Sequence, residues 1–199
     1  MIKIGVLASG RGSNFQSIID SIDSGAIDAK VACLITDNPA AYAIERAKLH
    51  NIPHVYINPA GSKDIFYKTI AGELIACGVE LVVLAGFMRV VKKPLIEAFP
   101  MRIMNIHPAL LPSFKGLHAQ RQALEYGVKI AGCTVHFVDE GVDTGPIILQ
   151  EAVPVLSDDT EESLSARILE CEHRIYPRAI KLYIEGKLSV TGNTVRIED

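Results

Sequence analysis

The sequence predicts an α/β fold, in which helices flank a mostly parallel sheet that is extended by antiparallel strands. Up to about residue 110, short apolar runs typical of strands alternate with segments whose apolar residues recur at helical spacing. The run 81–87 is almost entirely aliphatic, as expected for a central parallel strand that is covered on both faces. Beyond residue 110, an acidic, glycine-rich turn separates two β-rich runs, which favours an antiparallel pair. We therefore expect a Rossmann-like fold of three layers.

The individual elements follow from the same patterns. A first strand over residues 2–9 runs into a glycine-rich loop, and a helix with apolar residues at helical spacing comes next. Further strands are expected at 31–36, 52–57, 81–87, in the stretch that carries Asn105, at 131–138, at 146–155 and in a hairpin over 188–197. Further helices are expected at 40–50, 63–77, 94–99, 117–126 and from about 161 to 186. The helix over 63–77 is expected to bury an apolar face made of Ile65, Phe66, Ile70, Leu74 and Ile75.

Composition and charge indicate an ordinary soluble enzyme. Hydrophobic residues make up 49% of the chain and charged residues 22%, while the net charge of −3 gives no electrostatic reason to expect nucleic acid or an anionic membrane as partner. No apolar stretch approaches the roughly 20 residues that span a bilayer, and the N-terminus does not resemble a signal peptide. The four cysteines are scattered, which favours neither a zinc site nor a disulfide framework. We expect a single domain over residues 1–199, located in the cytoplasm.

The glycine-rich loop Ser9–Asn14 is a candidate anion-binding turn. Glycine allows the backbone to approach a ligand closely, and the free amides at the start of the following helix favour a phosphate. The loop is not a dinucleotide fingerprint, because that spacing fails at Gln16 and Ser17, and no Walker lysine follows. The alternative is a plain turn between a strand and a helix, with Ser13 or Asn14 as the helix cap.

The stretch 104–113 carries the strongest candidates for chemistry. It begins as the end of an apolar strand and breaks into a loop bounded by Pro108 and Pro112. Because side chains alternate along a strand, Asn105 and His107 project from the same face where the chain leaves the sheet. A carboxamide beside an imidazole can hold a carbonyl oxygen and move a proton. The alternative is an Asn and a His that only close a turn.

An acidic loop could supply a partner for His107. Ligands of parallel α/β sheets bind beyond the carboxyl ends of the strands, so the glycine loop, the segment 88–89 and residues 105–107 should gather at one edge. Asp143 lies in the turn between the two late strands, too far along the chain for sequence alone to pair it with His107. It could orient the imidazole and favour its protonated form. The alternative is an ordinary turn, since Asp, Gly and Pro all favour turns.

Four motifs occur together in this order and cover most of the chain. They are Ser9-Gly10-x-Gly12-Ser13-Asn14, Leu84-Ala85-Gly86-Phe87-Met88-Arg89, Asn105-Ile106-His107-Pro108 with Leu110-Leu111-Pro112, and Asp143-x-Gly145-Pro146. This set closely resembles the phosphoribosylglycinamide formyltransferase family, a branch of the formyltransferase superfamily. Within the superfamily, the glycine loop and the residues Glu172-His173 with Tyr176-Pro177 favour that branch.

The resemblance implies a formyltransferase fold and a reaction in purine (IMP) biosynthesis. A formyl group would pass from 10-formyltetrahydrofolate, the co-substrate, to the amine of glycinamide ribonucleotide. Asn105 and protonated His107 would stabilise the oxyanion of the tetrahedral centre. Asp143 would raise the pKa of His107 and help to move the amine proton towards the folate N10. No acyl-enzyme is required, and no metal is expected.

The resemblance also implies the substrate contacts. Residues of about 1–100 would form the half that binds the ribonucleotide phosphate, and residues of about 101–199 the half that binds folate and carries out catalysis. Ribonucleotide contacts are expected from Gly12, Ser13, Asn14 and Glu172. Glu172 could instead be an ordinary solvated helix charge, and Lys63 a solvated residue at a helix start. Folate contacts are expected from Lys63, Met88, Arg89, Val90, Val91, Asn105, Asp139 and Asp143.

Several alternative functions remain open from the sequence. Formyl transfer to initiator methionyl-tRNA would call for an additional C-terminal domain and a basic surface. Hydrolysis of formyltetrahydrofolate would call for a regulatory domain before the catalytic one. A Rossmann dehydrogenase would call for the dinucleotide glycine spacing, and only Asp37 ends the second strand as a ribose-binding residue would. A scaffold without catalytic activity would not call for this set of polar residues. We expect small-molecule substrates, and a monomer or homodimer.

Overall fold

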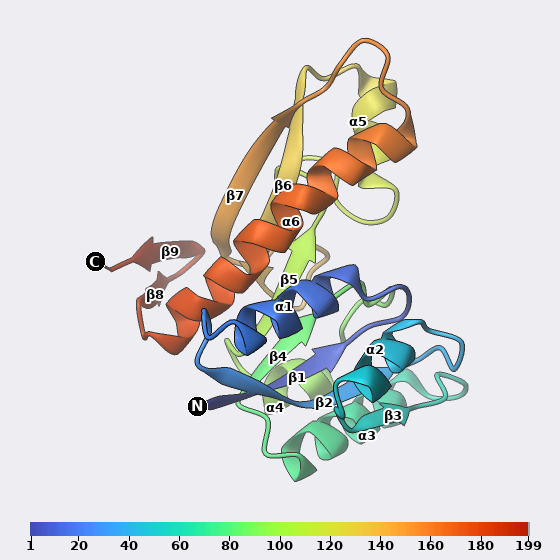
Figure 1. Ribbon diagram of the computed structural model, residues 1–199, viewed down its shortest axis with the longest axis vertical. Coiled ribbons are helices and arrows are strands. Elements are labelled where there is room, and N and C mark those ends of the chain that lie inside the picture. The colour runs from blue at the N-terminus through green and yellow to red at the C-terminus, as the bar shows by residue number, and fades with distance from the viewer. Residues whose placement is uncertain (199) are drawn as a thin grey trace. The chain divides into compact units, whose positions relative to one another are not determined.

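The computed structural model of the chain describes residues 1–198. It consists of two compact units, one from Met1 to Asn105 and the other from Ile106 onward (Figure 1). The division lies close to residue 100, where the sequence predicts the phosphate-binding half to end. The organisation as one domain stays a prediction.

The first unit contains five parallel strands in the order β3-β2-β1-β4-β5 (Figure 1). The centre of this sheet is apolar, since all four residues of β4 are buried, as the aliphatic run predicts. The last strand, β5, continues past the boundary between the units, and so ends in the second. The strands span Ile2–Leu7 (β1), Ala29–Thr36 (β2), His54–Tyr56 (β3), Leu81–Leu84 (β4) and Ile103–His107 (β5).

Four helices connect these strands. Helix α1 packs against α2 and β2, α2 packs against β2 and β3, and α3 packs against α4. This alternation of strand and helix gives the parallel pairing that the sequence predicts, because a parallel pair needs a crossover connection. The helices span Ser13–Asp23 (α1), Ala43–Leu49 (α2), Lys63–Ala76 (α3) and Lys93–Ala98 (α4).

The predicted apolar face of α3 is partly wrong. Ile65 is 67% exposed and Ile75 is 61% exposed, whereas Tyr67 is almost fully buried. Each residue turns an α-helix by about 100°, so the buried stripe is rotated by one position from the predicted one. The prediction is based on aliphatic residues and so includes the two isoleucines. The ring of Tyr67 brings more apolar surface, and its hydroxyl donates to the Val90 carbonyl. The buried residues of α3 are Phe66, Tyr67, Ile70, Ala71 and Leu74.

The second unit is built around an antiparallel pair, β6 and β7, with the long helix α6 packed on both strands (Figure 1). A capping box between Thr160 and Ser163 starts this helix, because both terminal backbone amides there find side-chain acceptors. Strand β9 pairs in parallel with β7 and antiparallel with β8, which confirms the predicted terminal hairpin. The elements span Ala119–Tyr126 (α5), Ile130–Phe137 (β6), Ile147–Pro154 (β7), Glu161–Ile184 (α6), Leu188–Thr191 (β8) and Thr194–Ile197 (β9).

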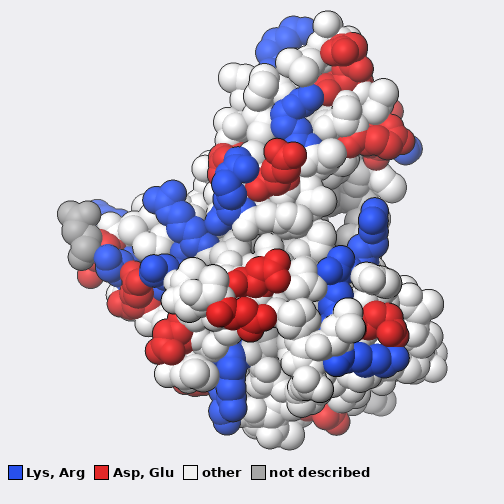
Figure 2. All heavy atoms as spheres, in the orientation of Figure 1, with Lys and Arg blue, Asp and Glu red and all other residues white. Residues whose placement is uncertain are grey.

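The surface and the helices bear on the predicted partners. Figure 2 shows cationic and anionic side chains interspersed over the visible face of each unit, without a large area of one sign. Within residues 1–198, no helix is long and apolar enough to cross a membrane. Across the same residues, no group of three or more His, Cys, Asp or Glu side chains is arranged to hold a metal ion. That the reaction needs no metal stays a prediction.

Candidate active site

The glycine loop between β1 and α1 has a geometry that only glycine accepts readily at one position. Gly12 is the residue before α1 and adopts a left-handed φ of 66°. A Cβ at Gly12 would lie 2.9 Å from the Cβ of Ala43 in α2, closer than real Cβ contacts. No side chain caps α1, so the alternative in which Ser13 or Asn14 is the cap is wrong. The first amides of α1 therefore have no side-chain cap at the helix start.

The loops that follow β1, β2 and β4 meet at the carboxyl ends of their strands. The amide of Ser9 donates to the carbonyl of Gly86 at 3.0 Å, and the amide of Met88 donates to the Ser9 hydroxyl at 3.0 Å. The side-chain amide of Asn38 donates to the carbonyl of Ser9 at 2.9 Å. The prediction that the glycine loop and the segment 88–89 gather at one sheet edge is confirmed.

Arg89 lies in a charged and aromatic environment within the first unit. Its Nε donates to Asp37 Oδ2 at 2.5 Å, and its guanidinium lies over the Phe66 ring at 5.8 Å from the ring centre. The hydroxyl of Tyr67 donates to the carbonyl of Val90 at 2.8 Å, and burial raises the pKa of Tyr67 to about 12. The phenol therefore stays a donor at neutral pH and fixes the backbone that follows Arg89.

A hollow of about 340 Å³ lies beside this segment. Four of the predicted folate-binding residues line it, and they bring two cations and two apolar side chains: Lys63, Met88, Arg89 and Val90. A third cation, Lys92, also lines it. Val91, the last residue of the predicted segment 88–91, is only 4% exposed and is not among the lining residues. Its side chain packs into the core instead.

His107 ends β5 with its imidazole almost fully buried. Asn105 lies two positions earlier in the same strand, opposite Leu84 of β4, so both polar side chains leave one face of β5 as predicted. His107 Nε2 lies 2.8 Å from the carbonyl oxygen of Phe114, which can only accept, so Nε2 carries a proton. The other ring nitrogen, Nδ1, lies 3.4 Å from Asp143 Oδ2. Any second proton therefore enters the ring next to the carboxylate.

Asp143 is fixed by several groups. It adopts a left-handed φ of 51°, and its Oδ2 accepts the amide of Gly116 at 2.8 Å. Its Oδ1 lies 3.7 Å from His136 Nε2. Burial alone would raise the pKa of Asp143, but the contact with His136, the Gly116 amide and the charge of His107 together lower it. Asp143 is therefore a carboxylate at neutral pH.

Gly145 explains how this loop reaches the histidines. A Cβ at Gly145 would lie 2.0 Å from the carbonyl oxygen of Phe137, so the chain crosses the end of β6 at a distance that only glycine allows. The amide of Phe137 donates to the carbonyl of Pro146 at 2.9 Å. The register between β6 and β7 also shifts here, since Val135 pairs with Leu149 and the next residue, His136, pairs with Ile147. Asp143 and His136 consequently meet.

The pKa of His107 departs from expectation in its direction. Burial lowers the pKa of His107, and although the Asp143 charge and the Phe114 carbonyl both act to raise it, burial outweighs them. Asp143 therefore acts on the pKa of His107 in the expected direction, but the expectation that His107 is protonated is wrong for the free protein. The sequence indicates the carboxylate but not the depth at which the imidazole lies. The resting imidazole is neutral at pH 7.

This shift predicts a pH dependence of stability. A histidine whose pKa is lower in the folded than in the unfolded state makes its full contribution to stability at pH values above its unfolded pKa of about 6.5. That contribution is lost as the pH falls below this unfolded pKa. We expect the free energy of unfolding to fall more between pH 7.5 and pH 5.5 in the wild-type protein than in His107→Gln. Urea unfolding at both pH values measures this. Equal losses in the two proteins would show that His107 is not the group responsible.

A polar network that the sequence does not single out holds the loop after His107. The hydroxyl of Thr134 donates to the carbonyl of Ala109 at 2.6 Å and accepts the amide of Leu111 at 3.0 Å. The side-chain amide of Gln150 donates to the Leu111 carbonyl and to the Thr134 hydroxyl, both at 2.9 Å. The available signal was the alternation of Thr134 and His136 within an otherwise apolar strand, which places both on one face.

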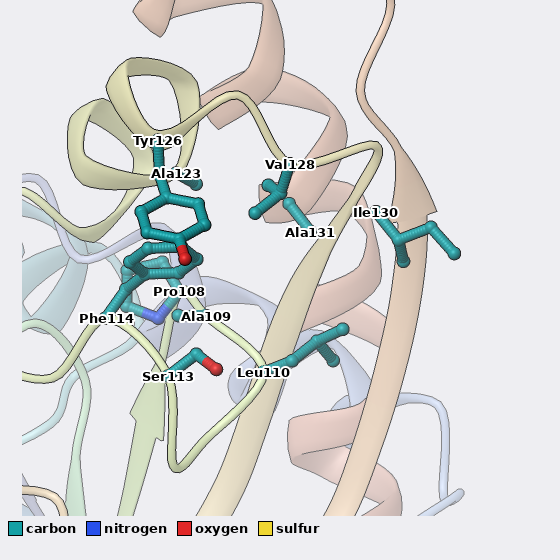
Figure 3. A pocket seen from close by; sticks show the side chains of 10 residues that line it. All are labelled: Pro108, Ala109, Leu110, Ser113, Phe114, Ala123, Tyr126, Val128, Ile130 and Ala131. Carbon is teal, nitrogen blue, oxygen red and sulfur yellow. The ribbon is translucent and has the colours of Figure 1, made fainter.

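A second hollow, of about 420 Å³, is lined in part by the loop after His107 (Figure 3). The rings of Phe114 and Tyr126 pack edge to face, with 6.0 Å between the ring centres, and form one wall of the hollow. The remaining lining side chains are apolar except for Ser113, so the hydroxyls of Tyr126 and Ser113 are the polar side-chain groups of this hollow. The lining residues are Pro108, Ala109, Leu110, Ser113, Phe114, Ala123, Tyr126, Val128, Ile130 and Ala131. The backbone of Phe114 thus joins this hollow to His107.

Two further predicted residues have clear places. Asp139 shapes the acidic loop, because its Oδ1 accepts the Thr144 hydroxyl at 2.6 Å and the Gly141 amide at 3.0 Å. Glu172 is only 7% exposed, so the alternative of a solvated helix charge is wrong. It lies near Cys133 of β6, where burial and then the Glu172 charge raise the pKa of the Cys133 thiol.

Comparisons with known proteins bear on the family and the fold of the chain. The family model described as formyl transferase matches residues 2–180. The phosphoribosylglycinamide formyltransferase of Bacillus subtilis is 45% identical over 183 residues, which cover 91% of this chain and 94% of that protein. The crystal structure of glycinamide ribonucleotide transformylase 1 from Symbiobacterium toebii is 56% identical, with a TM-score of 0.99, and the match covers 100% of this chain and 95% of that one.

Some relatives are much longer. The trifunctional purine biosynthetic protein adenosine-3 of Drosophila melanogaster is 46% identical over 188 residues, and the match covers 92% of this chain. The chain spans only 14% of the length of that protein. The fold class predicted from the sequence is confirmed by the structural match and by the parallel and antiparallel strands of the two units. On these findings the chain belongs to the formyl transferase family.

Proposed function

We propose that the protein transfers the formyl group of 10-formyltetrahydrofolate to the amine of glycinamide ribonucleotide, a step of purine biosynthesis. The products are formylglycinamide ribonucleotide and tetrahydrofolate. Membership of the family and the names of the full-length relatives support this reaction. The observation that carries it is the contact of 3.4 Å between His107 Nδ1 and Asp143 Oδ2, because a buried imidazole beside a carboxylate can take up and release a proton.

The reaction needs one bond made, one bond broken and one proton moved. The neutral amine attacks the formyl carbon, which gives a tetrahedral centre with an oxyanion and a developing ammonium. Asn105 donates a hydrogen bond to the oxyanion. His107 enters the reaction neutral, so it accepts the amine proton at Nδ1, and the imidazolium that forms is stabilised by Asp143. The proton then passes to the folate N10 as the bond from that nitrogen to the formyl carbon breaks.

Each substrate contact is assigned to residues whose chemistry suits it. The amides of Gly12, Ser13 and Asn14 hold the phosphate at the open start of α1. Glu172 accepts hydrogen bonds from the ribose hydroxyls, a role that a buried carboxylate suits.

The formyl donor carries aromatic rings and carboxylates. The hollow beside Met88 offers both apolar surface and the cations Lys63 and Arg89, so its lining suits that molecule. Backbone groups near Val90 read the edge of the ring system. Asp139 acts on the folate side by holding the acidic loop that carries Asp143.

A single assay tests the reaction. Purified protein is mixed with 10-formyltetrahydrofolate, with and without glycinamide ribonucleotide, and the release of tetrahydrofolate is followed. We expect release only when the ribonucleotide is present, together with one equivalent of formylated product. Release without the ribonucleotide, accompanied by formate, would instead identify a hydrolase. A parallel reaction with glycinamide riboside, which lacks the phosphate, should be much slower if the glycine loop binds the phosphate.

The proposal extends to the surroundings of the enzyme. We propose a cytoplasmic enzyme that acts on small molecules, as a monomer or homodimer, without nucleic acid as partner. Sedimentation of the purified protein gives the oligomeric state directly.

A further inference from the structure

We propose that Arg46 is a positioning residue for the phosphate-binding loop: it fixes the direction of the peptide between Arg11 and Gly12, and so turns the amide of Gly12 towards the phosphate. The inference rests on the proposed function of the glycine loop. Arg46 itself contacts no substrate in this proposal.

The side chain of Arg46 contacts both the glycine loop and the first turn of α1. Its Nε donates to the carbonyl oxygen of Arg11 at 2.9 Å, and its Nη1 donates to Gln16 Oε1 at 2.9 Å. The guanidinium also lies over the ring of Tyr42, 5.1 Å from the ring centre. One rigid planar group on α2 therefore connects the middle of the loop with the first turn of α1.

Gln16 is itself held, so the connection is anchored at both ends. Its Nε2 donates to Asp20 Oδ1 at 2.8 Å and lies 3.1 Å from His50 Nε2. His50 Nδ1 in turn lies 3.6 Å from Asp23 Oδ2. The side chains on this side of the loop form a continuous network from α1 to the end of α2.

The carbonyls of three consecutive loop residues are all committed to donors within the first unit. The carbonyl of Gly10 accepts the amide of Ala43 at 3.1 Å, that of Arg11 accepts Arg46 Nε, and that of Gly12 accepts the amide of Gln16 at 2.9 Å. In a planar trans peptide the N–H points opposite to the C=O. The amides of residues 11, 12 and 13 are therefore directed away from these donors, which is the arrangement that binds an anion.

Among these three peptides, only the middle one is held by a side chain. Backbone amides hold the other two, so a substitution cannot remove them. A lysine at position 46 would keep the charge but offers one compact ammonium instead of a planar fork, and so cannot reach the Arg11 carbonyl and Gln16 in the same geometry. Geometry rather than charge is thus the property that Arg46 supplies.

The test compares Arg46→Met and Arg46→Lys with the wild-type enzyme. We expect both variants to raise KM for glycinamide ribonucleotide at least tenfold, on the order of the loss of one charge-assisted hydrogen bond, while kcat and KM for the formyl donor hold. Activity with glycinamide riboside should not change, because that substrate makes no use of the loop. Lys48→Met is the matched control, since Lys48 lies on the same helix and pairs with Glu45 of that helix.

Each outcome decides the matter. A wild-type KM in Arg46→Lys would show that charge alone suffices and would overturn the positioning role. Equal losses with the ribonucleotide and the riboside would overturn it as well, because they would indicate general damage to the fold.

Calorimetric titration of inorganic phosphate gives a readout that does not need formyl transfer. If the wild-type protein transfers no formyl group but binds phosphate, and Arg46→Lys does not bind it, the proposed reaction fails while the inference stands. If wild-type protein binds no phosphate, the inference fails.

Discussion

Replacing His107 with alanine is expected to lower turnover by on the order of 10²-fold or more, while ribonucleotide binding is retained. The imidazole is the proton carrier in the proposed reaction, and alanine has no group that can take up or release a proton in its place. Asp143→Asn is expected to have a similar effect. Asparagine keeps the shape of the side chain and accepts a left-handed backbone, so this change removes the charge that stabilises the imidazolium with little effect on the loop.

Single-turnover kinetics and a separate measurement of ribonucleotide affinity distinguish the loss of chemistry from the loss of binding. His54→Ala is the control, because His54 is exposed and lies in β3, where its Nδ1 is 3.4 Å from the Ile52 carbonyl oxygen. Near-normal turnover in Asp143→Asn, with an unchanged pH profile, would contradict the role given to this carboxylate. A loss of ribonucleotide affinity in His107→Ala equal to the loss of turnover would contradict the division of roles.

Substituting Gly12 with alanine is expected to weaken ribonucleotide binding by tenfold or more and to destabilise the protein by about 1–3 kcal/mol, the usual range for a strained backbone position. Two effects add. The left-handed φ of 66° disfavours any side chain, and the new Cβ would lie 2.9 Å from the Cβ and 3.2 Å from the Cα of Ala43. The loop must therefore shift, and with it the amides that are assigned to the phosphate.

Gly10→Ala is the matched control in the same loop. A Cβ there meets nothing within 4 Å, and Gly10 does not have a positive φ. Calorimetric titration with the ribonucleotide and thermal unfolding of both variants measure the two effects. Equal affinities of the Gly10→Ala and Gly12→Ala proteins for the ribonucleotide would remove the loop from the phosphate site.

The helices and strands were predictable because apolar residues recur with the period of a strand or of a helix along the sequence. The pairing of Asn105 and His107 on one face needed only the two-residue period of a strand. The exposure of Ile65 and Ile75 was not predictable in this way, because the choice between neighbouring stripes of a helix depends on what the helix packs against. A period alone does not say which of two adjacent apolar faces turns inward.

The roles of the candidate site residues stay predictions, and the electrostatics of the site was not predictable from the sequence. The resemblance implies that Asp143 and His107 belong to one reaction, yet the sign of the pKa shift of His107 depends on the depth of the imidazole, which is a property of the packed structure. The supporting residues were hidden for a related reason. Thr134, Gln150 and Arg46 act through backbone carbonyls and amides, and no side-chain pattern records which carbonyl a distant donor will reach.

The attachment of the segment after His107 to Thr134 and Gln150 has a consequence for how this chain can evolve. The segment is secured through its backbone, at the Ala109 carbonyl and at both polar groups of the Leu111 peptide, by residues that lie outside it. The side chains of this segment are therefore not needed to hold its backbone beside the imidazole. We therefore expect substitutions at Leu110 and Ser113, which line the apolar hollow of Figure 3, to change the shape of that hollow while the backbone contacts of Ala109 and Leu111 are kept.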